Sequence, residues 1–302
     1  MNKILITGTS GFVGSRVARA LQDRYELLTP SHGECDITRL EAVEAYVGQH
    51  RPEAILHLAA ISDTGYCEQH PEESMAVNVQ GVVHMAEAAA RYGCKLVWFS
   101  SDQVYNGNCE LGPLSEEVDV CPENHYGRHK LLAEKEALKR CPDSVALRAT
   151  WMYDVRREGM PTHNNFVLNI EEALRQGTPL RFATREYRGI TWVDEVVKNI
   201  PHTLSLPGGV YNFGAENDRN TYDTARAYLD IIGCSTPDIA VPDHERFAAH
   251  VRNISISMHK AVEASGGAIQ FASTVEGLKS FLIMNYEGSC KQRRSSFDEV
   301  NS

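Results

Sequence analysis

The stretch Thr7–Gly14, which reads Thr-Gly-Thr-Ser-Gly-Phe-Val-Gly, constrains the fold of this chain more than any other feature. It follows the apolar run Ile4–Ile6, and together they predict a buried strand that turns sharply through glycines into a helix. Glycines at 8, 11 and 14 let the backbone approach a pyrophosphate, whose charge then lies at the helix N-terminus. Such a turn can also be a plain strand-to-helix connection, so a second signal is needed.

The second signal is Tyr-Gly-Arg-His-Lys at residues 126–130. Tyr126 and Lys130 are four residues apart and therefore share one face of a helix. A free tyrosine titrates near pH 10, and we expect the ammonium of Lys130 to lower the pKa of Tyr126 toward neutral pH. We expect Ser101, at the end of the preceding strand, to hold a substrate carbonyl oxygen beside the phenol. The same spacing would also fit an exposed tyrosine and a surface lysine.

Short apolar runs alternate with amphipathic stretches over roughly the first 150 residues, the pattern of a parallel sheet with helices on both faces. The fold class predicted is α/β, a Rossmann-type doubly wound parallel sheet over residues 1–150. Its predicted strands are Lys3–Thr7, Glu26–Thr29, Ala54–Leu58, Lys95–Ser100 and Ser144–Ala149. Its predicted helices are Phe12–Gln22, Leu40–His50, Glu73–Tyr92 and Tyr126–Arg140. Ligands of such sheets bind outside the carboxyl ends of the strands.

The alternation loosens afterwards, which predicts a smaller substrate-binding region over residues 151–286 with some segments returning to the sheet. The region is expected to begin with the loop Asp154–Asn164. The helices predicted there are Phe166–Gln176, Trp192–Thr203, Thr221–Gly233 with Thr221 as its cap, and Val275–Met284. The predicted strands are Leu180–Phe182 and Gly209–Phe213. Residues 287–302 are polar and are expected to form a disordered tail.

Composition excludes several classes of function. The formal net charge of −10 argues against a nucleic-acid or anionic-membrane surface, and no apolar run approaches the roughly 20 residues of a membrane span. A strand begins at once, so no signal peptide is expected. The eight cysteines contain no CxxC pair, which indicates reduced thiols in a cytoplasmic protein. The histidines show no HExxH spacing, so no metal is expected.

On these motifs the chain resembles the extended short-chain dehydrogenase/reductase family. Within it, the likeness over roughly residues 3–230 is to dTDP-4-dehydrorhamnose reductases and related sugar-nucleotide-binding proteins. Further segments that carry the resemblance are Asp36–Thr38, His57–Ala60, Val77-Asn78, Ser100–Tyr105, Leu147–Tyr153, Asn164–Val167 and Arg188–Thr191.

The resemblance implies a nicotinamide cofactor and a nucleotide-sugar substrate. The catalytic residues it implies are Ser101, Tyr126 and Lys130. The cofactor-binding residues it implies are Gly8, Ser10, Gly11, Phe12, Val13, Gly14, Ser31, His32, Asp36, Ile37, Ala59, Ala60, Asn78, Ser100, Tyr126 and Lys130. The substrate-binding residues it implies are Asp102, Gln103, Trp151, Asn165 and Arg188. Burial of Trp151 and a backbone-fixing role for Asn78 are the alternatives for those two side chains.

The end of the second strand bears on the choice of cofactor. A carboxylate there would bind the ribose 2′-hydroxyl and favour NAD, but the chain has Ser31 and His32, with Glu34 a little later. We expect Ser31 and His32, helped by Arg16, to accept the 2′-phosphate of NADP. The alternative is a turn that faces solvent and accepts either NADP or NAD.

The function predicted is NAD(P)H-dependent reduction of a keto-sugar nucleotide. Sugar-nucleotide dehydratases carry an Asp-Glu pair where this chain has Asp102-Gln103, and an amide cannot serve as a general acid or base. Two alternatives stay open: a non-catalytic NADP-binding regulatory subunit that resembles the β subunit of methionine adenosyltransferase, and a nucleotide-sugar epimerase. The resemblance also suggests a homodimer through the helices Glu73–Tyr92 and Tyr126–Arg140.

Overall fold

The computed structural model describes residues 2–108, 110–234 and 236–285; the tail predicted at 287–302 lies outside these residues. At its centre is a six-stranded sheet in the order β10-β5-β4-β3-β1-β2, with every neighbouring pair parallel. The strands are β1 (Lys3–Thr7), β2 (Glu26–Leu28), β3 (Ala54–His57), β4 (Lys95–Ser101), β5 (Val145–Ala149) and β10 (Gly209–Phe213). The predicted doubly wound parallel sheet is therefore confirmed.

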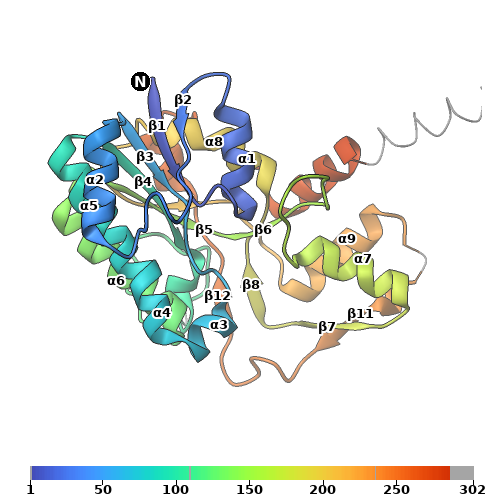
Figure 1. Ribbon diagram of the computed structural model, residues 1–302. Coiled ribbons are helices and arrows are strands. Elements are labelled where there is room, and N and C mark those ends of the chain that lie inside the picture. The colour runs from blue at the N-terminus through green and yellow to red at the C-terminus, as the bar shows by residue number, and fades with distance from the viewer. Residues whose placement is uncertain (1, 109, 235, 286–302) are drawn as a thin grey trace, which may run out of the picture.

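Helices cover both faces of the sheet, as Figure 1 shows. In β1, Ile4 and Ile6 point into one apolar core while Leu5 points into the other, because side chains alternate along a strand. The first core is covered by α1 (Phe12–Leu21) and α8 (Val193–Thr203). The second is covered by α2 (Leu40–His50), α5 (Gly81–Tyr92) and α6 (His125–Arg140).

The single helix predicted over Glu73–Tyr92 is interrupted. After the short helix α3 (Thr64–Gln69), the chain forms α4 (Pro71–Met75), a π-helical turn η1 (Ala76–Gln80) and then α5. A π turn inserts an extra residue and re-aims the side chains in it. Here the amide of Asn78 donates to the Ile61 carbonyl oxygen at 2.9 Å and accepts from the Ile61 N–H at 3.0 Å. The turn therefore fixes the segment that follows β3.

Three two-stranded parallel ribbons lie outside the central sheet. They pair β6 (Trp151–Tyr153) with β9 (Ile190–Trp192), β7 (Leu180–Ala183) with β11 (Ala240–Asp243), and β8 (Glu186–Arg188) with β12 (Arg252–Ile254). The helices of this part are α7 (Phe166–Gln176), α9 (Thr221–Ile231), α10 (His259–Ala264) and residues 274–285. Figure 1 shows α7, α9, β7 and β11 gathered to one side of the central sheet.

The predicted cap of α9 is wrong by one residue. Asn220 caps the helix, because its side-chain oxygen accepts from the Asp223 N–H at 2.8 Å. The hydroxyl of Thr221 instead donates to Glu186 Oε2 at 2.9 Å, which ties α9 to β8. Among the described residues, none of the helices combines the length and apolar character needed to cross a bilayer.

A buried ion pair joins α1 to the loop that follows β6. Arg16 Nε and Nη2 both lie 2.9 Å from Asp154 Oδ2, and the two side chains are 3% and 0% exposed. Arg16 Nη1 also donates to the Pro161 carbonyl oxygen at 3.0 Å. Arg157 contacts the same carboxylate and bridges it to Asp194 of α8. The loop is thus bound to the helix that follows the glycine turn.

Replacing Asp154 with Asn should destabilise the protein by about 3 kcal/mol, because it leaves the buried guanidinium of Arg16 without a counter-charge. Urea denaturation measures the free energy of unfolding. The control is Glu276→Gln, which removes an exposed partner of Lys279 and should change that free energy by less than about 1 kcal/mol. Equal stabilities of the two variants would contradict the role given to the pair.

Candidate active site

The candidate site lies where β1, β3 and β4 end at one edge of the sheet. The glycine turn follows β1, Ala59 and Ala60 follow β3, and Ser101 is the last residue of β4. Parallel strands present their carboxyl ends together, so segments far apart in sequence meet there.

Gly8 and Gly14 must be glycines because a side chain at either position would collide with the backbone. Gly8 has φ +75°, and a Cβ there would lie 2.6 Å from the Ala59 nitrogen. A Cβ on Gly14 would lie 2.1 Å from the Gly8 carbonyl oxygen, so Gly14 lets α1 pack against the strand end. Gly11 is exposed, and its Cβ would meet Gly8 O at 3.2 Å. Gly11 is therefore the glycine that leaves room for a ligand at the start of α1.

The other side chains predicted in this turn differ in accessibility. Ser10 is exposed, and Val13 packs partly against the core. The ring of Phe12 is covered by the guanidinium of Arg16 at 4.2 Å and by the ring of His163 at 4.3 Å. Phe12 thus holds the loop after β6 over the beginning of α1.

The turn after β2 places the carboxylate of Glu34 at the predicted 2′-phosphate site. The main-chain N–H and the hydroxyl of Ser31 both donate to Glu34 Oε2, at 2.8 and 2.7 Å. His32 is largely exposed and lies 3.7 Å from Asp36 Oδ1. The expectation that Arg16 would help to bind a 2′-phosphate is wrong, because its guanidinium is bound to Asp154.

Next to this turn, Asp36 and Ile37 are fixed locally. The carboxylate of Asp36 accepts from the N–H and the hydroxyl of Thr38, at 3.0 and 2.7 Å, and these bonds lower its pKa. Ile37 is buried against Gly81, where a Cβ would lie 3.0 Å from Ile37 Cδ1.

The predicted catalytic residues come together. Tyr126 is buried, and the hydroxyl of Ser101 lies close enough to its phenol to affect its pKa. Lys130 Nζ lies 5.7 Å from the centre of the Tyr126 ring and donates to the Phe99 carbonyl oxygen at 2.8 Å. Asn124 begins the helix that carries both residues, because its side chain accepts from the Gly127 N–H at 2.6 Å. The phenol, the hydroxyl and the amine therefore form one cluster at the end of β4.

The electrostatics of the cluster correct one expectation. Burial raises the pKa of Tyr126 above its ordinary value, while the nearby hydroxyl of Ser101 opposes that rise. The phenol is therefore protonated at neutral pH, as a proton donor must be. Burial lowers the pKa of Lys130 to about 8, so its amine is mostly charged at pH 7. The predicted lowering of the Tyr126 pKa by Lys130 is not what the structure shows.

Three side chains that were expected to bind ligands are engaged within the protein instead. Ser100 donates to Glu134 Oε1 at 2.5 Å, on the opposite face of β4 from Ser101. Asn78 binds the main chain of Ile61, so its backbone-fixing alternative is the one observed. Asn165 is fully buried: it caps α7 by accepting from the Leu168 N–H at 3.1 Å and donates to the Asp154 carbonyl oxygen at 3.0 Å.

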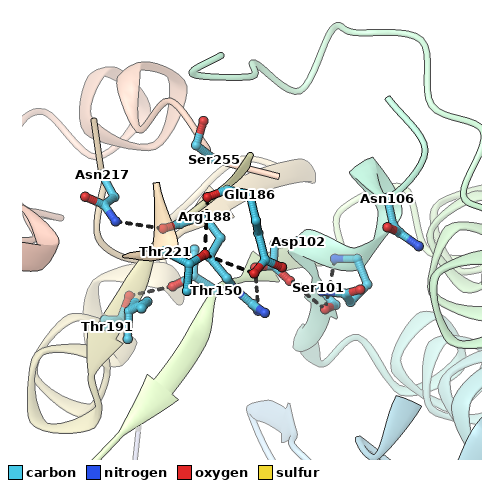
Figure 2. Close-up of polar contacts among 12 residues, drawn as sticks. Ser101, Asp102, Asn106, Thr150, Glu186, Arg188, Thr191, Asn217, Thr221 and Ser255 are labelled. Atoms are coloured by element: carbon cyan, nitrogen blue, oxygen red, sulfur yellow. Dashed lines mark hydrogen bonds and ion pairs between the residues drawn. The ribbon is translucent and has the colours of Figure 1, made fainter. Parts of the chain in front are cut away.

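Polar side chains of the second region lie beside Ser101 and Asp102, as Figure 2 shows. Arg188 Nη2 lies 3.4 Å from Asp102 Oδ2, and the Arg188 guanidinium lies over the ring of Trp151 at 4.9 Å. The hydroxyl of Ser101 donates to the other oxygen of Asp102 at 3.3 Å. Burial raises the pKa of Asp102, and the positive charges of Arg188 and Arg252 oppose the rise. The predicted substrate residues Asp102, Gln103, Trp151 and Arg188 are thus brought together.

Two charged residues of the site, Glu186 and Arg252, escaped the sequence analysis. Arg252 of β12 forms an ion pair with Glu186 of β8 and donates to Gln103 Oε1 at 2.9 Å. Both sit in three-residue strands, which give no periodic signal. Arg252 and Glu186 are 66 residues apart in the sequence, and Arg252 and Gln103 are 149 residues apart. No local sequence motif could therefore have predicted these contacts.

A cavity of about 350 Å³ opens beside Trp151, between α7 and β7. Phe166, Phe182 and Leu180 supply apolar lining, while Arg181 and Asn164 add polar groups. Among the described residues, no group of three or more histidine, cysteine and carboxylate side chains is arranged to hold a metal ion.

The sheet, the glycine turn and the Ser-Tyr-Lys cluster define a protein of the short-chain dehydrogenase/reductase class. Residues 1–281 match the family described as RmlD substrate binding domain, and the chain belongs to that family. It is 25% identical to the spore coat polysaccharide biosynthesis protein SpsK of Bacillus subtilis, over 88% of this chain and 92% of that protein. It is 28% identical to a dTDP-4-dehydrorhamnose reductase of Aggregatibacter actinomycetemcomitans, over 76% and 79% of the two chains.

Solved structures share the fold. A dTDP-4-dehydrorhamnose reductase of Bacillus anthracis in complex with NADP superposes with a TM-score of 0.80 at 23% identity, covering 94% of this chain and 100% of that one. A UDP-glucose 4-epimerase of Thermotoga maritima with UDP-glucose gives 0.76 at 23% identity, over 95% and 99% of the chains. The predicted family is confirmed. A reductase and an epimerase share the fold equally well, so the choice between these two activities depends on the residues of the site.

Proposed function

We propose that the protein is an NAD(P)H-dependent reductase of a keto-sugar nucleotide. The observation that carries this proposal is the buried cluster of Ser101, Tyr126 and Lys130 at the sheet edge that also holds the glycine turn. The name of the reductase relatives supports the substrate class. The amide of Gln103, where a dehydratase would need an acid, argues for reduction without elimination.

Each residue of the cluster has a distinct task. When bound, the nicotinamide cofactor supplies the hydride for the carbonyl carbon. The protonated phenol of Tyr126 donates a proton to the carbonyl oxygen, and the hydroxyl of Ser101 orients that oxygen. The charged amine of Lys130 stabilises the phenolate that remains and can donate to the ribose of the cofactor. Gly11 and the N-terminus of α1 would hold the diphosphate of the cofactor.

The nucleotide end of the substrate fits the cavity beside Trp151. Its volume of about 350 Å³ and its aromatic lining suit a base and its ribose. Arg188 lies between this cavity and Ser101 through its contacts with Trp151 and Asp102, where a guanidinium can bind a diphosphate. We further propose a homodimer formed through the segments Glu73–Tyr92 and Tyr126–Arg140, on the resemblance, and a cytoplasmic location, on the scattered cysteines.

We expect Gly11→Val to weaken binding of NADPH and NADH by about tenfold or more, because the added side chain enters the path of the pyrophosphate. The backbone of Gly11 needs no left-handed conformation, so the fold should survive. Calorimetric titration gives the affinities, and the melting temperature reports folding. Unchanged affinity in a folded variant would remove the turn from the binding site.

We expect NADPH to bind up to about tenfold more tightly than NADH, a difference of about 1.4 kcal/mol. Glu34 holds both donors of Ser31, so Glu34→Gln should increase this preference by removing a negative charge from the 2′-phosphate site. Glu41→Gln, in α2, is the control. The readout is the ratio of the two dissociation constants. Tighter binding of NADH by the parent would exclude Ser31 and His32 as a phosphate site.

Tyr126→Phe should slow reduction by about 10²–10⁴-fold while leaving cofactor affinity nearly intact, because it removes a positioned general acid. The assay is single-turnover oxidation of NADPH, followed by absorbance, with a panel of 4-keto nucleotide sugars. A variant as fast as the parent would refute the proton transfer. A parent that binds NADPH but reduces no sugar would favour the regulatory subunit, and a retained, non-exchanging NAD would favour the epimerase.

A further inference from the structure

Arg252 reaches from β12 into the segment that follows the catalytic strand. Its Nη2 donates to Gln103 Oε1 at 2.9 Å and its Nε donates to Asn106 Oδ1 at 3.0 Å. Its Nη1 bonds Glu186, the residue opposite it in the β8–β12 ribbon. The side chains of Arg252 and Glu186 are 14% and 8% exposed. The guanidinium therefore makes three bonds to three different residues in a largely buried place.

The bond from Arg252 fixes which way the amide of Gln103 faces. Gln103 Oε1 also accepts from Asn124 Nδ2 at 3.3 Å, so the oxygen faces two donors. The amide nitrogen must then point the other way, where it donates to Asp102 Oδ1 at 3.2 Å. A reversed amide would place its N–H₂ group against two other donors and lose all three bonds.

The oriented amide in turn fixes the catalytic pair. Ser101 donates to the same Asp102 oxygen at 3.3 Å and accepts from the Gln103 N–H at 3.2 Å. The Ser101 hydroxyl is therefore held by the Asp102 carboxylate and by the main-chain N–H of Gln103, beside the phenol of Tyr126. Asn124 caps the helix that carries Tyr126. The side-chain amide of Gln103 thus contacts Asp102, which binds Ser101. It also contacts Asn124, which caps the helix with Tyr126, and Arg252 of the β8–β12 ribbon.

We propose that Arg252 is a positioning residue for catalysis, which acts through Gln103 to align Ser101 with Tyr126. The inference rests on the proposed reductase function. Lysine would keep the positive charge of Arg252, but its single ammonium cannot reproduce the planar fork that serves three partners. The arrangement therefore depends on the shape of the guanidinium as well as on its charge.

The test compares Arg252→Lys with a matched control, Arg185→Met. Arg185 precedes the same ribbon, is exposed and donates to the Ala248 carbonyl oxygen. We expect kcat of Arg252→Lys to fall at least about tenfold, because small misplacements of catalytic groups are costly. KM and Kd for NADPH should stay within about twofold of the parent, as the glycine turn is untouched. Turnover equal to that of Arg185→Met would overturn the proposal.

A second variant guards against a folding defect. Removing Arg252 alone would leave the buried Glu186 without its ion-pair partner, so the double variant Arg252→Met/Glu186→Gln removes both charges together. It should bind NADPH like the parent and lose turnover like Arg252→Lys. A double variant with full turnover would show that neither charge positions the site.

A readout without turnover separates this proposal from the proposed function. With ¹⁵N-labelled glutamine, the side-chain amide of Gln103 is assigned by its loss in Gln103→Met. Its signals should move in Arg252→Lys and stay fixed in Arg185→Met. If the parent reduces no sugar, the reductase function fails, while the amide signals still decide whether Arg252 orients Gln103. Unmoved signals in Arg252→Lys would refute the orientation.

Discussion

The close backbone contact at the first turn is the constraint on which the site depends. A Cβ on Gly14 would lie 2.1 Å from the carbonyl oxygen of Gly8, and a Cβ on Gly8 would lie 2.6 Å from the Ala59 nitrogen, in the backbone after β3. These contacts set the distance between β1, α1 and the segment at Ala59. Side chains at either glycine would push α1 away from the sheet edge. The place where a diphosphate could meet the helix N-terminus would then no longer exist.

The parts of the fold that were predictable from sequence are those governed by local patterns. Residues 3–7 form a strand because their apolar run is buried on both faces, and Phe166–Gln176 forms a helix because its apolar residues recur at helical spacing and Asn165 caps it. The π turn at Asn78 escaped prediction because it serves a contact with Ile61 that no helical period encodes. The predicted cap of α9 was wrong by one residue because Asn220 and Thr221 are both good capping residues.

In the candidate site, too, the predictable residues were those that local sequence patterns identify. Ser101, Tyr126 and Lys130 were found because the chemistry fixes their spacing relative to a strand and a helix. Glu186 and Arg252 were not, because their positions follow from the pairing of two short strands late in the chain. Asn165 was assigned to the substrate because the segment around it carries the family resemblance. Its motif is visible in the sequence, while the burial that reserves its side chain for capping is visible only in three dimensions.

The ion pair between Arg16 and Asp154 bears on how this protein can be divided. A cut near residue 150 looks natural because the alternating pattern ends there. It would separate the guanidinium of Arg16 from its carboxylate and would also remove β10, the edge strand beside β5. The half that carries the glycine turn is therefore not an autonomous module. Chimeras that exchange substrate specificity should keep residues 154 and 209–213 with the N-terminal half or choose a donor that carries the same pair.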